Sequence, residues 1–289
     1  MIASTVARHY ALGDLASRIF AALEADGRDL ASLTVDDLAP VDAFHIRGRV
    51  ATEELAGWVR PRPADRVLDV GSGLGGTGRY LASRFGCAVE GVDLTEEYCR
   101  VATTLSERVG LLGRTGFRTA DACALPFADA SFDVVWTEHV QMNVGDKAAF
   151  YGELVRVLRP GGRLAFHDVF AGLEDEPHYP VPWASDATIS HLVTVPVAET
   201  LLGGLGLRRE RWAERTAESR AFFRGVLERV ASGRALALGI HLLMGEDAVT
   251  KIRNLLRNLD EQRVRVVQAV MTKPAATPSP TASGLPPRL

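Results

Sequence analysis

Residues 66–78 read RVLDVGSGLGGTG, a short apolar run that breaks into closely spaced glycines. This pattern predicts a buried parallel strand that turns directly into a helix. Glycine suits such a turn because a side chain would hold the backbone away from a bound molecule, and because tight turns use φ values that glycine adopts at little cost. The stretch therefore predicts a ligand site at the end of a first strand.

The chemistry of that ligand is indicated by Asp69, two positions before the first glycine. Gly71, Gly73 and Gly76 match a Gly-x-Gly-x-x-Gly pattern, which fits nicotinamide, flavin and several other sites. A carboxylate at position 69 would repel a pyrophosphate, whereas it would hold a ligand that carries an ammonium group. S-adenosylmethionine carries such a group, so Asp69 favours this cofactor.

Four ordered blocks resemble the class I S-adenosylmethionine-dependent methyltransferases. They are VLDVGSGLGG, the segment CAVEGVD that ends at Asp93, DACALPFADASFDVVWTEH from 121 to 139, and LVRVLRPGGRLAFHD from 154 to 168. The resemblance covers roughly residues 45–215, and it is greatest to the small-molecule branch with the sarcosine/dimethylglycine and ubiquinone-pathway enzymes. It implies S-adenosylmethionine as cofactor and says far less about the methyl acceptor.

The composition favours a small-molecule substrate. Of the 289 residues, 47% are apolar and 24% are charged, which is ordinary for a globular protein with a substantial core. The net charge is −3, from 33 basic and 36 acidic residues, without a long block of one sign. A nucleic-acid partner normally leaves a basic footprint, so none is expected.

The cysteines and the apolar segments indicate a cytoplasmic protein. The three cysteines are odd in number and lack a Cys-x-x-Cys spacing, which argues against a disulfide framework and a zinc site. Arg8, His9 and Asp14 interrupt any signal-peptide core. The most apolar stretch, 235–244, is about half of the ~20 residues that a membrane span requires. We expect no membrane association, and a homodimer stays open.

Strands and helices alternate through the middle of the chain, which predicts a parallel sheet with helices on both faces. The resemblance implies a Rossmann-like α/β fold with a seven-stranded, mostly parallel sheet, closed by an antiparallel last strand. We expect strands at 66–70, 87–92, 116–120, 132–137, 162–168, 207–214 and 263–271, and helices at 75–85, 95–109, 146–158 and 196–203.

The organisation predicted around this core has five parts. An N-terminal helical cap spans 1–62; it either covers the helices beside the sheet or forms a flap over the site. The S-adenosylmethionine-binding core spans 63–216, a helical lid spans 217–262, and the last strand of the core lies in 263–273. The tail 274–289 is rich in proline and is expected to be disordered.

Polar residues follow several predicted strands, whose carboxyl ends meet at one edge of the sheet. Asp93 is expected to accept hydrogen bonds from ribose hydroxyls, with capping of the next helix as the alternative. In similar enzymes the position of Asp121 and Ala122 binds the adenine edge; a solvated loop acid is the alternative. The residues expected to bind the cofactor are Asp69, Gly71, Ser72, Gly73, Gly75, Asp93, Leu94, Asp121, Ala122 and Glu138.

His139 is the candidate catalytic residue, because an imidazole that titrates near neutrality can accept a proton from a nucleophile or orient it. Its place just past a strand, facing the methyl donor, favours this role over a structural one. His167 next to Asp168 does not indicate a metal pair, because adjacent strand residues point to opposite faces. No metal is expected.

Substrate contacts are sought in three places. His45 and Arg49 precede the first strand and would contact the cofactor carboxylate or form a surface salt bridge. Gln141 and Met142 follow His139 in the same loop. Aromatic residues can surround a methylated cation or simply fill a core. The candidate substrate-binding residues are Tyr10, His45, Arg49, Gln141, Met142, His178, Tyr179 and Trp183.

The predicted function is an enzyme that transfers a methyl group from S-adenosylmethionine to N or O of a small molecule by in-line displacement. The acceptor would be an amine, an amino-acid-like compound or a natural product. C-methylation of a quinone, phenol or terpenoid-like acceptor is the alternative. A nicotinamide-dependent reductase is disfavoured by Asp69 and by the lack of a Tyr-x-x-x-Lys pair, and a non-catalytic cofactor-binding subunit by the presence of His139.

Overall fold

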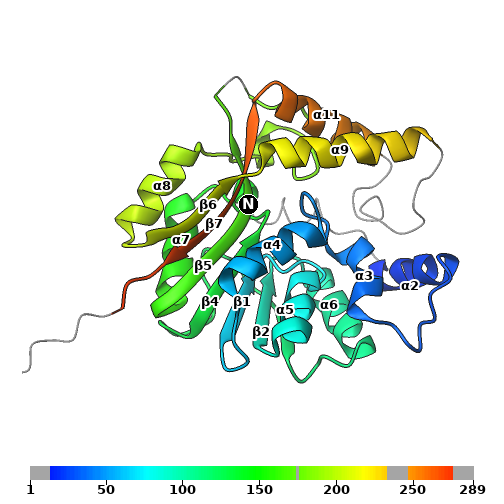
Figure 1. Cartoon of the computed structure of the whole chain (residues 1–289), viewed down its shortest axis with the longest axis horizontal. Coiled ribbons are helices and arrows are strands. Elements are labelled where there is room, and N and C mark those ends of the chain that lie inside the picture. Colours follow the sequence, from blue (N-terminus) through cyan, green and yellow to red (C-terminus); the bar gives the residue numbers. More distant parts are fainter. Residues whose placement is uncertain (1–13, 174–175, 233–246, 276–289) are drawn as a thin grey trace, which may run out of the picture.

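A seven-stranded sheet runs through the molecule in the order β3-β2-β1-β4-β5-β7-β6 (Figure 1). The computed structural model describes residues 14–173, 176–232 and 247–275. The strands are β1 (Arg66–Val70), β2 (Ala88–Asp93), β3 (Thr115–Thr119), β4 (Phe132–Glu138), β5 (Leu158–Ala171), β6 (Arg208–Glu214) and β7 (Val264–Thr272). Strands β1 to β5 pair in parallel, whereas β7 is antiparallel to β5 and β6. The predicted fold class is confirmed.

Strand β5 is longer than the sequence predicts, because it keeps pairing with β7 as far as Ala171. At its start the partner of β4 jumps from Leu158 to Arg163 while β4 advances only from Phe132 to Val134. The Pro-Gly-Gly segment between them is a bulge, with Gly161 at φ +80°. The expected turn therefore lies inside the strand rather than before it.

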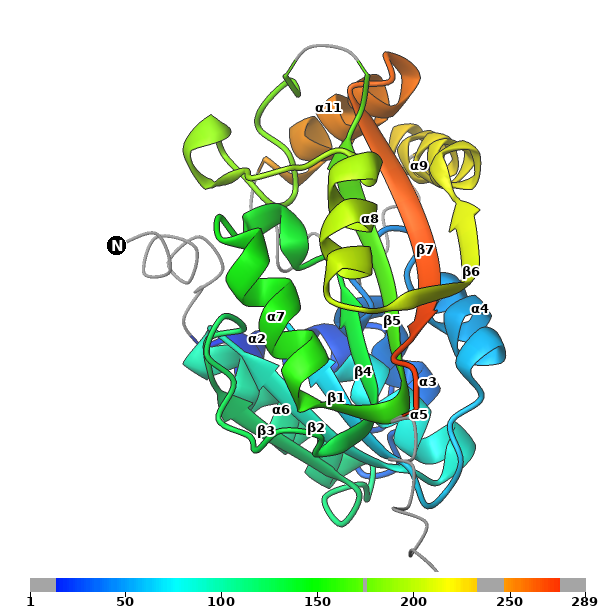
Figure 2. The ribbon, with the colours of Figure 1, turned by 90° about the vertical axis from the view of Figure 1, so that its left-hand side faces the viewer.

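Helices cover both faces of the sheet. On one face α4 (Arg49–Val59) and α5 (Gly76–Phe85) bury apolar residues such as Leu55 and Leu81 against Val67 and Trp136. On the other face lie α7 (Lys147–Val157) and α8 (Val195–Gly204), which are in front of the sheet in Figure 2. Helix α6 (Glu96–Arg108) packs beside β2 and β3. The carboxyl edge of the sheet is left for a ligand.

The predicted N-terminal cap, 1–62, contains the described helices α2 (Leu15–Ala25), α3 (Val35–Asp42) and α4, of which α4 packs on the sheet. Leu15 and Ile19 of α2 pack against Leu105 of α6, so α2 covers a helix beside the sheet. Helix α3 continues past Pro40 to Asp42 although proline removes a backbone donor. Burial of Leu38 and Val41 accompanies the loss of that bond.

Beyond the carboxyl end of β5, α9 (Thr216–Ala231) and α11 (Ala248–Asp260) lie side by side (Figure 1). They share a second core with β7 and with the loop after β5, which contains the 3₁₀ helix η2 (Ala187–Ile189). Phe223 is the buried aromatic residue of α9, whereas Phe222, which the periodicity places inward, is 38% exposed. No described helix has the length and hydropathy of a membrane span.

Three predictions fall outside the described residues. Tyr10 precedes them, residues 233–246 of the predicted lid interrupt them, and the predicted tail lies beyond residue 275 except for its first two residues.

Candidate active site

The glycine turn after β1 packs closely against the end of β2 and the loop after β4. The N–H groups of Gly71 and Ser72 both donate to the carbonyl oxygen of Val92, at 2.8 and 2.9 Å. Gly71 has φ +75°, and a Cβ atom there would lie 2.1 Å from Cγ2 of Val140. Only glycine fits this position. Gly75 lies behind the turn, where a Cβ would meet the ring of Phe117.

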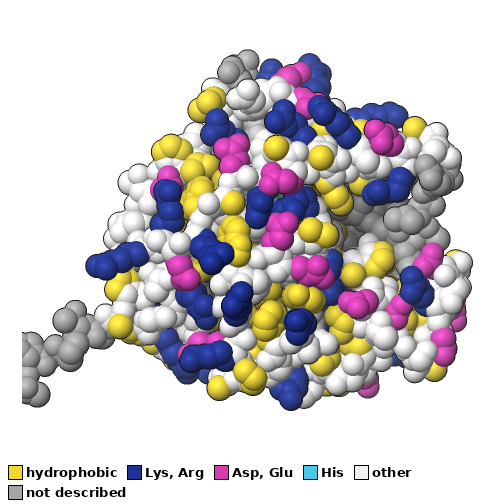
Figure 3. All heavy atoms as spheres, in the orientation of Figure 1, with side chains coloured by type: hydrophobic (Ala, Val, Ile, Leu, Met, Phe, Trp, Pro, Cys, Tyr) yellow, Lys and Arg dark blue, Asp and Glu magenta, His cyan; other side chains and the backbone are white. Residues whose placement is uncertain are grey.

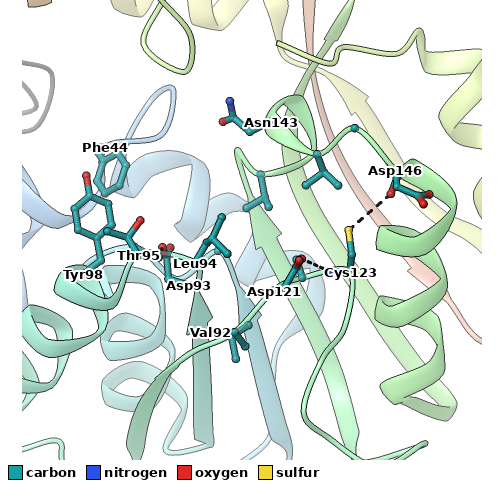
Figure 4. A pocket seen from close by; sticks show the side chains of 17 residues that line it. Phe44, Val92, Asp93, Leu94, Thr95, Tyr98, Asp121, Cys123, Asn143 and Asp146 are labelled. Atoms are coloured by element: carbon teal, nitrogen blue, oxygen red, sulfur yellow. Dashed lines mark hydrogen bonds between the residues drawn. The ribbon is translucent and has the colours of Figure 1, made fainter. Parts of the chain in front are cut away.

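A cavity of about 400 Å³ opens beside this turn, at the carboxyl ends of β1, β2 and β4. In Figure 4, Phe44 and Tyr98 lie on one side of it, and Asp121 and Cys123 on the other. Its volume is within the range of small-molecule sites. Its lining residues are Phe44, Gly71, Gly73, Val92, Asp93, Leu94, Thr95, Tyr98, Ala120, Asp121, Ala122, Cys123, Val140, Asn143, Val144, Gly145 and Asp146.

Asp93 ends β2 at the wall of this cavity, and backbone donors fix its orientation. Oδ2 accepts the N–H of Gly73 and Oδ1 accepts the N–H of Thr95, both at 2.9 Å. Thr95 is the residue that precedes α6, so Asp93 does act at the start of that helix, which was the alternative to a ligand role. Each carboxylate oxygen can accept a second hydrogen bond, and Asp93 therefore remains able to bind hydroxyl groups.

Asp121 and Ala122 line the same cavity after β3. Asp121 is exposed, and its Oδ1 accepts the N–H of Cys123 at 2.8 Å (Figure 4). Burial, followed by the nearby Asp121 and Asp146, raises the pKa of the Cys123 thiol to about 11. The Cys123 thiol that lines the cavity is thus neutral near pH 7.

A second, smaller cavity of about 50 Å³ adjoins the first, since Phe44, Gly71 and Gly73 line both. Its other lining residues are polar: Asp42, His45, Asp69, Ser72, Thr77, Glu138 and His139. Asp69 is 3% exposed, and its Oδ2 has no hydrogen-bond partner among the described residues. Burial, then Glu138 and Asp93, raise the pKa of Asp69 well above its usual value. A cation entering this cavity would satisfy Asp69.

Glu138 is held from two sides at the end of β4. It accepts hydrogen bonds from Thr77 Oγ1 at 2.6 Å and from Thr52 Oγ1 at 3.1 Å. Nε2 of His45 lies 3.5 Å from Oε1. Thr52 belongs to α4 and Thr77 to α5, so two helices and the segment that carries His45 orient this carboxylate toward the small cavity.

Three histidine rings meet beside Glu138. The ring centroids of His139 and His167 are 5.3 Å apart, and each lies 6.1 Å from that of His45. Burial, followed by the other two histidines, lowers the pKa of His139 well below its usual value. Burial likewise lowers the pKa of His167 to about 3. Both rings are therefore neutral near pH 7.

The neutral form of His139 is further defined by its contact with the cap. Nε2 of His139 lies 3.4 Å from the N–H of Ile46, for which it acts as acceptor. The ring proton is thereby assigned to Nδ1. His139 has φ +58°, in the left-handed region that few residues other than glycine adopt. Its neighbours thus hold it in a restricted orientation.

The loop after His139, with the 3₁₀ helix η1 (Gln141–Asn143), is clamped by two buried charges. Oδ2 of Asp168 accepts the N–H groups of Val140 and Gln141, both at 3.1 Å. Nζ of Lys147 donates to the carbonyl oxygens of Gln141 and Val144. Burial raises the pKa of Asp168 to about 6 and lowers that of Lys147 to about 8.

Several candidate substrate residues line neither cavity. Arg49 lies over the Tyr80 ring at 4.9 Å and pairs with Asp36 and Asp42. Nε2 of His178 lies 2.7 Å from Oε2 of Glu261.

The remaining candidates are held in the second core or at its edge. Met142 and Trp183 are buried there, with Tyr179 packed against them, and Nε1 of Trp183 donates to Ser190 Oγ at 3.0 Å. Gln141 donates from Nε2 to the carbonyl oxygen of Val169. Of the candidate substrate residues that the structure describes, His45 is the one that lines either of these two cavities.

Other residues that line the cavities were not predicted from the sequence, among them Asp42, Phe44, Thr77 and Tyr98. Thr77 lies within the quoted glycine stretch and could have been singled out as a polar side chain at the second residue of the helix. Asp42 and Phe44 lie in the cap, where no motif marks them. Across the described ranges, no group of three or more His, Cys, Asp or Glu side chains has a metal-binding arrangement.

Residues 68–166 match the family model described as "Methyltransferase domain". This chain contains a methyltransferase domain. The match spans the glycine turn, Asp93, Asp121 and His139. The predicted family is confirmed at the level of this domain and its fold.

Curated relatives of the methyltransferase domain differ in the atom that their names imply they methylate. The chain is 43% identical over 99 residues to a chloroplastic tocopherol O-methyltransferase of Arabidopsis thaliana, covering 34% of this chain and 28% of that protein. It is 34% identical over 119 residues to a glycine/sarcosine/dimethylglycine N-methyltransferase of Actinopolyspora halophila, covering 41% and 21%. The aligned parts thus span less than a third of either relative.

Among solved structures, the fold resembles geranyl diphosphate C-methyltransferase from Streptomyces coelicolor A3(2) in complex with Mg²⁺, geranyl-S-thiolodiphosphate and S-adenosyl-L-homocysteine. The TM-score is 0.67 at 17% identity, and the alignment covers 94% of this chain and 98% of that one. At this identity the likeness concerns the fold of the methyltransferase domain and its additions.

Proposed function

We propose that this chain transfers the methyl group of S-adenosylmethionine to nitrogen or oxygen of a small molecule. The observation that carries the proposal is the unpartnered, buried carboxylate oxygen of Asp69 in a polar cavity that opens into a larger, mostly apolar one. A ligand with an ammonium group at one end and an aromatic nucleoside at the other matches this division. The relatives named as O- and N-methyltransferases and the solved C-methyltransferase of similar fold keep the acceptor atom open, and C-methylation is the alternative.

The residues that line the two cavities fit the groups of S-adenosylmethionine. Asp93 is oriented to accept ribose hydroxyls, Leu94, Asp121 and Ala122 border the space for adenine, and Asp69 and Glu138 offer carboxylates to an ammonium group. Ser72 lines the small cavity with them. When bound, S-adenosylmethionine supplies a methyl group on a sulfonium centre, which is already a strong electrophile.

The work left to the protein is positioning and exclusion of water. Val140 and Phe44 give the cavity apolar walls, and the Asp168 and Lys147 clamp fixes the loop that carries Val140. The Nδ1–H of His139 is available to donate a hydrogen bond to an acceptor molecule. A neutral ring of lowered pKa is a weak base, so we assign His139 an orienting role in preference to proton abstraction.

The N-terminal helices and α9 with α11 are proposed to border the acceptor chamber, since both groups lie outside the sheet and its flanking helices. Basic and acidic side chains are interspersed over the described part of the face in Figure 3, which agrees with a small-molecule acceptor. All three cysteines are free, which agrees with a reducing compartment such as the cytoplasm.

The test is calorimetric titration with S-adenosylhomocysteine and, separately, with NADPH. We expect the first to bind and the second not, and Asp93→Ala to weaken the first by about 1.5–3 kcal/mol, as for hydrogen bonds to charged groups. Asp129→Ala, which removes a carboxylate 79% exposed on the surface, is the matched control and should bind normally. Binding of NADPH without S-adenosylhomocysteine would overturn the proposal.

The acceptor is then sought with a panel of amines, phenols, amino acids and quinols, scored by formation of S-adenosylhomocysteine. Nuclear magnetic resonance of the product identifies the methylated atom. A C–CH₃ product from a quinol would select the alternative reaction.

A further inference from the structure

Asp42, the last residue of α3, carries a carboxylate with one satisfied and one unsatisfied oxygen. Oδ2 lies 2.8 Å from Nη2 of Arg79, and both side chains are fully buried. Oδ1 is buried too, yet within the described part of the chain it has no hydrogen-bond partner. The cation recorded nearest to Oδ1 is Nη2 of Arg49, in a salt bridge of 3.8 Å that is too long for a hydrogen bond, and both Nη atoms of Arg49 are likewise buried without a hydrogen-bond partner among the described residues. An unsatisfied buried acceptor destabilises the fold, so the position calls for a reason.

That oxygen belongs to the wall of the small polar cavity. Asp42 lines it together with Asp69 and Glu138, and Oδ2 of Asp69 is unpartnered as well. The two unsatisfied oxygens come from different parts of the fold, α3 of the cap and β1 of the sheet. Asp42 lies close to the start of α5, where a Cβ on Gly76 would be 2.5 Å from Oδ1. Glycine at 76 therefore leaves room for this carboxylate.

The charges around the cavity favour a cationic occupant. Its wall contains three carboxyl groups, Asp42, Asp69 and Glu138. The buried guanidinium of Arg79 donates to Asp42, to Ser106 and to the carbonyl oxygens of Leu74 and Ala102. Those bonds engage Arg79 with Asp42 Oδ2, so that Oδ1 keeps only the longer contact of 3.8 Å with Nη2 of Arg49 and can still accept a hydrogen bond.

We propose that Asp42 binds the ammonium group of the cofactor together with Asp69, so that the cap supplies one of the two acidic groups that receive it. The inference rests on the proposed function. If Asp42 contacts the amino-acid end of the ligand, binding of that end also holds α3 against the core. Ligand binding and the docking of α3 are then coupled. A ligand that lacks the amino-acid end would fill the larger cavity without this coupling.

The test compares two ligands on Asp42→Asn by calorimetric titration. S-adenosylhomocysteine carries the ammonium group, and 5′-methylthioadenosine shares the nucleoside and thioether but lacks the amino-acid end. We expect Asp42→Asn to weaken S-adenosylhomocysteine at least tenfold and 5′-methylthioadenosine less than twofold. Asp36→Asn is the matched control on the same helix, because Asp36 is 94% exposed, and it should change neither affinity.

Equal losses for the two ligands in Asp42→Asn would mean that Asp42 only holds the cap, and would overturn the inference. Unchanged affinity for S-adenosylhomocysteine would overturn it too. If wild-type protein bound neither ligand, the proposed function itself would fail, which is a different result.

A second measurement needs no variant. Hydrogen exchange of the wild-type amides of residues 35–43 should slow when S-adenosylhomocysteine is added at saturation and change little with saturating 5′-methylthioadenosine. Equal slowing by both ligands would contradict the coupling even if Asp42→Asn failed to fold.

Discussion

The imidazole of His167 donates a hydrogen bond from Nε2 to the carbonyl oxygen of Ile46 over 3.0 Å, although 121 positions separate the two residues. The N–H of the same Ile46 faces Nε2 of His139. Both backbone groups of one cap residue are therefore engaged by histidines, one directly after β4 and one within β5. The position of the cap and the orientation of the candidate catalytic ring are thus fixed by the same contact.

His139→Ala should lower kcat while leaving the affinity for S-adenosylhomocysteine nearly unchanged. If the ring acts as a true general base, the loss should be roughly 10²-fold or more. An orienting role predicts a smaller loss with a raised KM for the acceptor. Because burial keeps the pKa of His139 low, the kcat profile of the wild type should show no titration of this ring between pH 7 and 9.

Steady-state kinetics on the best acceptor, with cofactor titration of the same variant, make this measurement. His139→Gln restores an acceptor for the N–H of Ile46 and should recover part of the activity. Full activity in His139→Ala would remove His139 from the mechanism.

Asp69→Asn should weaken cofactor binding and at the same time stabilise the ligand-free protein. The substitution removes a buried charge that lies near Glu138 and Asp93, so its loss relieves repulsion in the absence of a cation. For a chain of this size each 1 kcal/mol of stability corresponds to about 2–4 °C in Tm. Thermal unfolding with and without S-adenosylhomocysteine should show the two effects with opposite sign. A lower Tm of the ligand-free variant would refute this account.

The stabilisation by Asp69→Asn should grow with pH. Folding raises the pKa of Asp69, so the folded state holds this proton at pH values where the unfolded state has lost it. The contribution of Asp69 to stability is therefore full below the unfolded pKa of about 3.9 and declines as pH rises toward the folded pKa. The difference in Tm between Asp69→Asn and wild type should be near zero at pH 4 and widen toward pH 7. A pH-independent difference would show that ionisation of Asp69 is not its cause.

Asp168→Ala should lower both the stability of the protein and the activity of the folded enzyme. It leaves the N–H groups of Val140 and Gln141 without their acceptor, at a cost of about 1–3 kcal/mol in the free energy of unfolding. The freed loop carries part of the cavity wall, so the KM for the acceptor should rise as well. Asp168→Asn retains one acceptor oxygen and should be intermediate in both. Reduced stability with unchanged kinetic constants would make Asp168 purely structural.

Arg79→Met should be strongly destabilising, by about 3–5 kcal/mol, because it strands the buried carboxylate of Asp42 without its cation. The double variant Asp42→Asn with Arg79→Met should recover part of that loss. Urea unfolding measures both. Arg100→Ala, which breaks a pair with Glu96 on the exposed face of α6, is the control and should leave the free energy of unfolding almost unchanged. A similar, small effect of both arginine substitutions would contradict the importance of burial.

The sheet and the glycine turn were predictable because they depend on short-range patterns. The apolar run before Gly71 and the acids at strand ends follow from the strand period and from glycine geometry. Asp146 caps α7 by accepting the N–H of Ala149 at 2.9 Å, and an aspartate directly before a helix is a local signal of the same kind. Such features need only a few neighbouring residues to be identified.

The cap contacts and the role of aromatic residues were not predictable in this way. Ile46 belongs to no motif, and its partners lie far along the chain. Trp183 was expected in the substrate pocket, but it is 1% exposed and its N–H is satisfied by Ser190 within the same loop. The residue type alone does not tell whether an aromatic side chain lines a pocket or fills a core, because both places favour a large apolar surface. Adjacent Phe222 and Phe223 likewise leave the phase of α9 ambiguous by one position.

The buried pair of Asp42 and Arg79 limits how this protein can be re-engineered. The two charges lie on opposite sides of the boundary between the cap and the rest of the chain. A chimera that takes its N-terminal helices from another methyltransferase, for example to widen acceptor scope, would leave Arg79 facing whatever residue replaced the acid. Grafts should therefore be chosen from donors with an acid at that position, or be made together with a change at 79, and libraries that vary the two halves independently should consist mostly of insoluble clones.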